Sequence, residues 1–523
     1  MKYIQTLGIT ILVIAITLFS IVPFLGSFQV TKRAIDKTFT EMEINDTTFI
    51  NTLKSSITSD KKQSILTISE KISKPLHNHN QKHTATKNWS EVIYKTHKDI
   101  AFNLLKQTGQ GTIANHKGLW LFLTFGLGII GALMYILPQF QSAPSIKHDQ
   151  IYQNVTTNRG WVAWIIFGWL VSFYVILYFF PHLIINWTFI LDPFKQFITG
   201  KVNAASQWFV YGSLYCVVMI VMGIRMAMKY RHNNYQLFRT ASVVFFQVIF
   251  AFLLVEILPL FNLPSVDLKN AWPLDYDFLF DWNVINLVSQ GNAGKAFFVW
   301  GIFFSILVIP VMVYFFGKRW YCSWVCGCGG LAETLGDPYR QHSDKSLKIW
   351  RFERYIIHAV LLFAVVMTVW TGYHTYNEIY HPKEGGDKLL GLSVFSIRGI
   401  YGFLIGSIFS GVIGTGFYPI FGNRVWCRFG CPLATYMGIV QRFKSKFRIT
   451  TNGNQCISCG NCSTYCEQGI DVRWYAQRGE NIVRASCVGC GVCSAVCPRG
   501  VLKLENEDGG RFSISEELKK EQL

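Results

Sequence analysis

Long apolar runs separated by polar segments dominate the pattern of this chain. One run lies near the N-terminus and seven follow, and each approaches the roughly 20 residues needed to cross a hydrocarbon core about 30 Å thick. Runs of this length predict membrane-spanning helices. We therefore expect eight spans, at about Leu7–Leu25, Gly118–Leu137, Gly160–Phe180, Gln207–Met228, Ala241–Leu260, Ala296–Phe316, Tyr355–Gly372 and Ile400–Ile420.

The first run is interpreted as a retained membrane anchor within residues 1–30. Lys2 precedes it, but the run is long for the hydrophobic region of a signal peptide and lacks a small-x-small cleavage site. Residues 31–117 are polar, rich in Lys, Thr, Ser and Asn, and contain no cysteine. They are expected to form a small, partly helical or mobile segment outside the membrane.

A histidine-rich tract lies within this exterior segment and contains His77, His79 and His83. It allows two interpretations, a metal site or a solvated loop. The solvated loop is favoured because nothing nearby supplies a carboxylate or thiolate partner.

The composition agrees with a membrane protein, since 15% of the residues are charged and 50% are hydrophobic. The formal net charge of +18 does not call for nucleic acid as a partner, because Lys and Arg collect in the cytoplasmic loops of membrane proteins. Basic residues gather in Arg225–Arg239, Lys318–Arg354 and Arg424–Arg448. We therefore expect a multi-pass protein of the bacterial inner (cytoplasmic) membrane, surrounded by lipid, with these segments and both termini on the cytoplasmic side.

Eight cysteines near the C-terminus form two motifs of the same spacing, Cys-x2-Cys-x2-Cys-x3-Cys. The first motif holds Cys456, Cys459, Cys462 and Cys466, and the second holds Cys487, Cys490, Cys493 and Cys497. This is the spacing of a bacterial ferredoxin with two [4Fe-4S] clusters, in which the fourth ligand of each cluster comes from the other motif. Cys497 would then complete the first set and Cys466 the second. Zinc sites and disulfide scaffolds do not show such a doubled triplet. Glu467 stands where the motif normally carries proline, and it removes no ligand.

Two segments that are 105 residues apart share the pattern Phe-Gly-x-Arg-x2-Cys-x3-Cys, one at Phe316–Cys326 and the other at Phe421–Cys431. Each segment closes a pair of spans, so the repeat suggests two related helical hairpins packed side by side. Positions i and i+4 of a helix share a face, so each segment would offer two sulfurs to one centre. That centre would be a metal or iron-sulfur site at Cys322, Cys326, Cys427 and Cys431, with Cys328 as a fifth sulfur. The alternative is that these cysteines are merely buried near the membrane interface.

Ionisable residues within the spans are further candidates, because such groups are costly in a bilayer. Glu256 and His358 are the candidates for proton, quinone or haem chemistry. Arg225 lies near the end of a span and is expected to reach the interface with its long side chain. Cys216 stands apart from the clusters formed by the other 13 of the 14 cysteines and is expected to be a small buried hydrophobe.

Spans that end in two Cys-x3-Cys elements, followed by a pair of ferredoxin motifs, resemble the membrane polyferredoxins of the NosR/NapH/CcoG group. The resemblance covers about residues 241–505. The exterior segment has no recognisable flavin-attachment signature, which a full NosR-like protein would have. Members of that group are associated with moving electrons between the quinone pool or cytoplasmic donors and periplasmic reductases, or with metal handling for oxidase assembly. The resemblance therefore implies an electron-transfer component.

The predicted fold is mainly α, a polytopic helical membrane bundle followed by a bacterial-type two-cluster ferredoxin-like α+β domain. The expected parts are the anchor at 1–30, the exterior segment at 31–117, membrane helices at 118–240, repeated membrane hairpins at 241–448, the ferredoxin domain at 449–505 and a polar tail at 506–523.

The predicted function is relay of electrons between a cytoplasmic or quinone donor and a membrane or periplasmic acceptor. Two [4Fe-4S] clusters would be the cofactors, and ferredoxin, flavodoxin or quinone are candidate redox partners. An alternative function is a metal-handling or metal-reducing assembly factor for a respiratory oxidase or reductase, which Cys328 and the histidine tract favour because soft thiolates suit Cu(I). The sequence contains neither a Walker loop nor a dinucleotide glycine fingerprint after a strand, so ATP or NAD chemistry is not indicated.

Overall fold

The structure, a computed structural model, describes residues 2–141 and 158–506, except residues 45, 60, 87, 89–90, 271, 381–387, 390–391 and 453–454. Nearly all of the predicted polar tail therefore lies outside the described residues. The chain divides into two compact units, one made of Met1–Gln141 and Val175–Leu214 and the other of Ser142–Tyr174 and Tyr215–Leu523. Helices α9 (Trp161–Phe179) and α11 (Gln207–Lys229) each contribute to both units.

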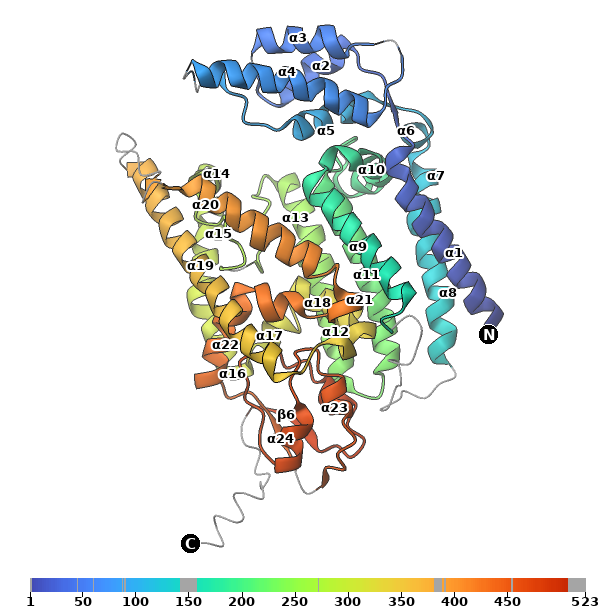
Figure 1. The fold of residues 1–523 in the computed structure, drawn as a ribbon, viewed down its shortest axis with the longest axis vertical. Coiled ribbons are helices and arrows are strands. Elements are labelled where there is room, and N and C mark those ends of the chain that lie inside the picture. Colours follow the sequence, from blue (N-terminus) through green and yellow to red (C-terminus); the bar gives the residue numbers. More distant parts are fainter. Residues whose placement is uncertain are drawn as a thin grey trace. The chain divides into compact units, whose positions relative to one another are not determined.

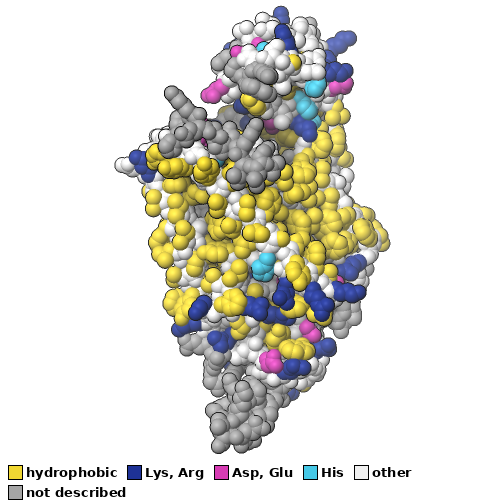
Figure 2. All heavy atoms as spheres, turned by 60° about the vertical axis from the view of Figure 1, so that its left-hand side comes forward, with side chains coloured by type: hydrophobic (Ala, Val, Ile, Leu, Met, Phe, Trp, Pro, Cys, Tyr) yellow, Lys and Arg dark blue, Asp and Glu magenta, His cyan; other side chains and the backbone are white. Residues whose placement is uncertain are grey.

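Among the described residues, eight helices are long and apolar enough to cross a membrane, which agrees with the predicted number of spans. On the face shown in Figure 2, hydrophobic side chains cover a broad band, and Lys and Arg side chains gather along one border of it. The last span ends earlier than predicted, because the chain turns at residues 414–417, where Gly414 and Gly416 lie. The spans are Lys2–Phe24, Lys117–Gln139, Trp161–Phe179, Gln207–Lys229, Asn234–Phe261, Gly291–Phe316, Leu347–Tyr380 and Val394–Ile413.

The first unit combines two long apolar helices with a small helical domain. Helices α1 and α8 pack closely, because glycines at positions 8 and 131 let their backbones approach each other. A Cβ atom added at Gly8 would lie only 2.8 Å from the carbonyl oxygen of Gly131. The elements of this unit, besides its parts of α9 and α11, are α1 (Lys2–Ile21), η1 (Val22–Phe24), β1 (Ser27–Phe28), α2 (Lys32–Glu41), α3 (Thr47–Ile57), α4 (Ile65–Ala85), α5 (His97–Thr108), β2 (Gly109–Gln110), α6 (Thr112–Asn115), α7 (Lys117–Leu121), η3 (Phe122–Gly126), α8 (Leu127–Gln141), η5 (Pro181–Ile184) and α10 (Ile185–Thr199).

The predicted exterior segment is an ordered helical domain. Helices α2 to α5 bury apolar side chains between them, among them Phe39, Phe49, Ile72 and Leu104, each exposed by 2% or less. Strands β1 and β2 pair antiparallel, with Ser27 opposite Gln110, and so join the beginning of this domain to its end. The histidine tract lies on helix α4, so the prediction of a solvated loop there was wrong.

The second unit holds the remaining spans and all of the clustered cysteines. Figure 1 shows that its C-terminal elements gather at the end of the helix bundle opposite α14. Its elements, besides its parts of α9 and α11, are α12 (Asn234–Phe245), η6 (Phe246–Leu253), α13 (Leu254–Ile257), η7 (Leu258–Phe261), α14 (Asp281–Ser289), α15 (Gly291–Phe303), η8 (Phe304–Val308), α16 (Ile309–Phe316), α17 (Arg319–Cys322), α18 (Gly327–Thr334), η9 (Asp337–His342), α19 (Leu347–Tyr380), β3 (Lys388–Leu389), β4 (Leu392–Ser393), α20 (Val394–Tyr401), η10 (Gly402–Ile413), α21 (Tyr418–Phe421), η11 (Trp426–Gly430), α22 (Pro432–Lys444), β5 (Arg448–Thr451), α23 (Asn461–Thr464), α24 (Val472–Arg478), α25 (Val492–Ala495) and β6 (Leu502–Glu505).

The internal repeat has the same backbone conformation in both copies. Helices α16 and α21 each end at the phenylalanine of the repeat, and the next residue is a glycine with a positive φ, +67° at Gly317 and +91° at Gly422. The corresponding ψ angles are −172° and 173°, a region of backbone space that is open essentially to glycine alone. The shared glycine therefore fixes the sharp exit of the chain from each helix.

We expect the Gly422→Ala variant to be destabilised by about 1–3 kcal/mol, because alanine would be strained at this φ and ψ. Its Cβ atom would also lie 2.5 Å from the Ser343 hydroxyl oxygen. Thermal unfolding of the full chain in detergent measures the effect. Gly399→Ala is the matched control, since a Cβ atom at Gly399 has no neighbouring atom within 4 Å. Equal unfolding temperatures for the two variants would contradict the prediction.

Candidate functional site

The two C-terminal cysteine motifs fold into equivalent loops. In each motif a glycine with a positive φ, +81° at Gly460 and +72° at Gly491, precedes a short helix that carries the third cysteine. These helices are α23 with Cys462 and α25 with Cys493. Strands β5 and β6 close the module as an antiparallel pair, with Arg448 opposite Glu505. We refer to residues 448–505 as the ferredoxin module.

The first set of thiols surrounds one cavity. Its lining includes the first three cysteines of the first motif together with the last cysteine of the second, which are Cys456, Cys459, Cys462 and Cys497. Arg473 and Arg499 also line the cavity, and both side chains are exposed. Cys459 is exposed as well, so this set lies close to the surface of the module.

The second set, Cys466, Cys487, Cys490 and Cys493, lies deeper in the protein. Burial raises the pKa of Cys493, and the neighbouring thiols Cys490, Cys466 and Cys487 raise it further. Burial likewise raises the pKa of Cys487 to about 11, and Cys466 adds to the shift. Clustered buried thiols of this kind ionise only with compensating positive charge, which iron supplies.

The Cys-x3-Cys elements do not lie on continuous helices, so the predicted i and i+4 geometry was wrong. Cys322 ends α17 and Cys326 precedes α18, with non-helical residues between them. Cys427 lies in the π-helical segment η11, and Cys431 precedes α22, where its sulfur accepts a hydrogen bond from the Ala434 amide at 3.4 Å. A new helix begins directly after each of these cysteines, α18 at Gly327 and α22 at Pro432. Proline is well suited to the first position of a helix.

The two hairpins nevertheless bring their sulfurs into one buried cluster. Cys322, Cys427 and Cys431 belong to the same hydrophobic core, and Cys326 and Cys328 pack against it. Burial raises the pKa of Cys431, and Cys427, Cys326 and Cys322 raise it further. A hydrogen bond from Cys328 lowers the pKa of Cys326 to about 6. We call these five residues the membrane cysteines.

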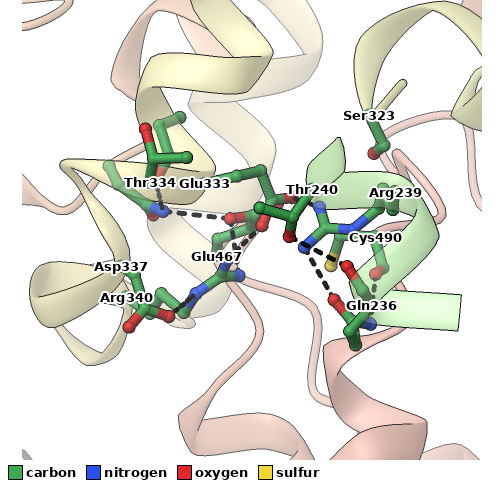
Figure 3. A network of polar contacts seen from close by, with 12 residues as sticks. Gln236, Arg239, Thr240, Ser323, Glu333, Thr334, Asp337, Arg340, Glu467 and Cys490 are labelled. Atoms are coloured by element: carbon green, nitrogen blue, oxygen red, sulfur yellow. Dashed lines mark hydrogen bonds and ion pairs between the residues drawn. The ribbon is translucent and has the colours of Figure 1, made fainter. Parts of the chain in front are cut away.

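A fully buried network of ion pairs joins the ferredoxin module to the membrane helices (Figure 3). Glu467, whose exposed fraction is 0%, lies 2.8 Å from Arg340 and 2.9 Å from Arg424. Glu333 pairs with Arg239 at 2.6 Å, with Arg424 at 2.7 Å, and with Arg340. These five residues come from α12, α18, η9, the segment before η11 and the module, and we call them the arginine–glutamate network.

Asp337 extends this network toward α11. Its carboxylate pairs with Arg225 at 2.8 Å, with Lys229 at 2.9 Å and with Arg340 at 2.8 Å. Burial opposes ionisation, but Lys229, Arg340 and Arg225 outweigh it and hold the pKa of Asp337 well below its usual value. The expectation that Arg225 reaches toward the interface was therefore wrong, since its side chain is buried in an ion pair.

The network also contacts the cysteines. Arg424 Nη1 lies 3.6 Å from Cys427 Sγ, and the Cys490 sulfur lies within 4.8 Å of the carboxylates of Glu333 and Glu467. Arg239 donates to Gln236 Oε1 at 2.7 Å, and Gln236 in turn donates to the Cys490 carbonyl at 2.8 Å. Arg239 Nε is buried and has no hydrogen-bond partner among the described residues.

Direct contacts hold the second ferredoxin loop against the membrane hairpins. Ser323, which follows Cys322, donates to the carbonyl of Val488, which follows Cys487, at 2.8 Å. Tyr235 donates to the Gly489 carbonyl at 2.9 Å, and Gln441 donates to the Cys487 carbonyl at 2.8 Å. The membrane cysteines and the second ferredoxin set therefore belong to neighbouring loops.

Sequence reasoning missed the arginine–glutamate network, because its members lie in five separate segments. The one local signal was Glu467 in place of proline. The two ionisable candidates within the spans do not join the site. His358 is exposed and lies against the carbonyl oxygen of Arg354 on its own helix, and Glu256 is half-buried.

Comparison with known proteins agrees with this geometry. The family described as 4Fe-4S binding domain matches residues 298–346 and 401–450, and each of these ranges contains one copy of the repeat. The family described as 4Fe-4S dicluster domain matches residues 448–498. The first of these matches includes the membrane cysteines, and the second includes all eight cysteines of the ferredoxin module.

Two curated proteins are similar over part of the chain. YccM of Escherichia coli (strain K12), which its name assigns to electron transport, is 24% identical over 178 residues, which are 32% of this chain and 46% of YccM. The methylamine utilization ferredoxin-type protein MauN of Methylobacillus flagellatus is 22% identical over 226 residues, which are 36% of this chain and 71% of MauN. The chain thus spans less than half the length of YccM. No solved structure matches it.

These findings confirm the predicted fold class, which is mainly helical with eight candidate spans and a C-terminal 4Fe-4S domain. The chain is a 4Fe-4S-binding protein with helices suited to a membrane.

Proposed function

We propose that this chain is an integral membrane electron-transfer protein that relays electrons between a soluble redox protein at the ferredoxin module and a quinone in the membrane. Similarity to YccM and MauN, and to the 4Fe-4S families, supports electron transfer. The observation that carries the proposal is the contact between Ser323 and Val488, since it joins the membrane cysteine loop directly to the second ferredoxin loop.

In this proposal each set of thiols holds one cluster. Bound iron-sulfur clusters supply reversible one-electron transfer at potentials set by their surroundings. The first set would be Cys456, Cys459, Cys462 and Cys497, and the second set Cys466, Cys487, Cys490 and Cys493. The third set would be Cys322, Cys326, Cys427 and Cys431, with Cys328 as a hydrogen-bond partner of Cys326. The protein fixes these sets by buried contacts, so their separations do not depend on a mobile tether.

The exposed face of the first set suits a soluble partner. Cys459 is exposed, and Arg473 and Arg499 stand beside the cavity. A basic rim attracts an acidic redox protein such as ferredoxin or flavodoxin. Docking of such a partner at this rim brings it next to the most accessible thiols of the chain.

The membrane side offers an apolar hollow beside the membrane cysteines. Trp324, which lies between Cys322 and Cys326 in the sequence, forms one wall of it. The other lining residues all belong to α12, and they are Tyr235, Phe238, Ala241, Ser242 and Phe245. Because this surface is mostly aromatic and lies on a span, it suits the ring of a lipid-soluble quinone.

We further propose that the protein resides in the bacterial inner membrane with its ferredoxin module in the cytoplasm, as the basic loop residues indicate. Reduced thiolates are also maintained on that side of the membrane. This arrangement is the one that the resemblance to the NosR/NapH/CcoG group implies.

A second candidate function is metal handling during assembly of another redox enzyme. The hydrogen bond between Cys326 and Cys328 favours it, because an extra thiol next to a low-pKa thiol can accept a transferred soft metal ion. The iron content of the Cys427→Ser variant distinguishes the two functions.

Replacing Cys427 by serine should lower the iron content of anaerobically purified protein from about twelve to about eight atoms per chain, while EPR signals of the two ferredoxin clusters remain. Electron transfer from reduced ferredoxin or flavodoxin to quinone should be lost. Cys216→Ala is the control, because Cys216 is also a buried cysteine but belongs to none of the three sets. A metal handler would instead keep about eight iron atoms in the unmodified chain, and the variant would leave a partner oxidase or reductase without its metal.

Replacing Glu467 by glutamine should destabilise the docked module by about 3–5 kcal/mol, because Arg340 and Arg424 would be left without part of their buried counter-charge. Thermal bleaching of cluster absorbance in the full chain measures the loss. Glu480→Gln is the control, since Glu480 lies in the same module but is exposed. If both variants bleach at the same temperature, the network does not hold the module in place.

Replacing Arg239 by glutamine should lower the reduction potential of the cluster held by the second set, because a buried positive charge stabilises the more negative, reduced state. We expect at least about a tenfold change in the one-electron equilibrium, or about 59 mV. EPR-monitored redox titration of the full chain measures it, with the exposed Arg442→Gln as control. An unchanged potential in a cluster-loaded Arg239→Gln protein would show that Arg239 acts only structurally.

A further inference from the structure

Three metal-ligating side chains meet in the helical domain of the first unit. Asp46, His79 and His83 each offer a ligand atom, and these atoms all lie within 4.8 Å of one another. The two histidines are four residues apart on α4, and Asp46 is the residue before α3. None of the three belongs to the iron-sulfur sites.

A carboxylate partner for the histidines could not be expected from local sequence, because Asp46 lies far upstream of the histidine tract. The fold supplies it: α3 and α4 pack against each other, and this brings the start of α3 to the second half of α4. Asp46 Oδ2 lies 3.4 Å from His79 Nε2, and the two side chains are exposed by only 14% and 10%. Phe49, which is exposed by 2%, packs against the His79 ring at 5.2 Å between centroids.

A backbone hydrogen bond fixes the Asp46 carboxylate, so that its second oxygen can bind a metal ion. Its Oδ1 accepts a hydrogen bond from the Phe49 amide at 2.9 Å and so caps α3. This bond fixes the carboxylate and leaves Oδ2 directed at His79. One oxygen is therefore structural, and the other is available to a metal ion.

The histidines are also placed by the fold. Their ring centroids lie 4.4 Å apart with an interplanar angle of 37°, as residues i and i+4 share one face of a helix. His79 Nε2 lies 3.0 Å from the carbonyl oxygen of Glu91, and His83 Nδ1 is buried without a hydrogen-bond partner among the described residues. Asn80, between them on α4, bonds both the amide and the carbonyl of Ile93 and so anchors the helix. A buried imidazole nitrogen without a partner is the atom that a bound ion would satisfy.

The donor set favours a transition-metal ion that accepts both imidazole and carboxylate ligands. Two imidazoles and one carboxylate match the three-protein-ligand zinc sites, which keep one position for water. Calcium and magnesium prefer oxygen ligands alone, and Cu(I) prefers thiolates or thioethers.

We propose that Asp46, His79 and His83 bind one Zn²⁺ ion and that this ion ties α3 to α4. The site goes beyond the proposed electron transfer and does not depend on it. Zinc would add a cross-link between α3 and α4 beside the contact of Phe49 with His79.

The test uses the full chain, purified anaerobically with its clusters in place and stripped of zinc by a chelator. Competition with a chromophoric zinc indicator should detect one ion per chain, and zinc K-edge absorption should show nitrogen and oxygen ligands without sulfur. His79→Ala and His83→Ala should each weaken binding by at least about 100-fold, since each removes one of three ligands.

Two further variants separate binding from folding. His77→Ala is the matched control, because His77 is an exposed histidine on the same helix and should leave the affinity unchanged. Asp46→Asn keeps an N-cap acceptor for Phe49 but removes the charge, so the domain should fold while zinc affinity falls at least about tenfold. Zinc that is absent, that is bound through sulfur, or that is retained by both His79→Ala and His83→Ala would overturn the proposal.

Discussion

The arginine–glutamate network is the constraint on which the architecture of the second unit depends. Arg239, Arg340 and Arg424 share Glu333 and Glu467, and all five side chains are almost completely buried. Buried charges are tolerated only when each has its counter-charge at close range, because removing one partner leaves the other desolvated and unpaired. Glu467 lies on the ferredoxin module and its partners lie on membrane-side segments. All of these charges are paired only when the module sits in this position against the helices. The two cysteine regions are therefore held next to each other by charge as well as by hydrogen bonds.

The internal repeat shows how one local pattern serves two tasks. Both copies use glycine to leave a helix and an arginine two residues later. Arg424 in the second copy enters the buried network, whereas Arg319 in the first copy lies 4.6 Å from the ring centroid of Phe447 and donates to Asn506 at 2.6 Å. One copy thus holds the loop that carries Glu467, and the other holds the strands at the base of the module. Equivalent positions in the two hairpins therefore contact different parts of the same module.

The spans and the ferredoxin cysteines could be predicted because each depends on a short stretch of sequence. An apolar run of sufficient length forms a helix in lipid, because a helix satisfies the hydrogen bonds of its own backbone. The geometry of the Cys-x3-Cys elements could not be predicted from their spacing, because Gly327 and Pro432 restart the chain as new helices. The network and the Asp46 contact with His79 were missed for another reason. Both contacts join residues that are distant in the sequence. The periodicity of apolar residues does not indicate which buried charged side chains will pair.

Glu467 has a consequence for how the molecule is made. Arg239, Arg340 and Arg424 are synthesised before Glu467, because the chain grows from its N-terminus. Until Glu467 leaves the ribosome, the three arginines have only Glu333 and Asp337 as carboxylate partners within the network, so positive charge is in excess there. Final closure of the bundle therefore waits for the C-terminal domain, so a prematurely terminated chain would present an open, positively charged helix junction to the quality-control proteases of the cell.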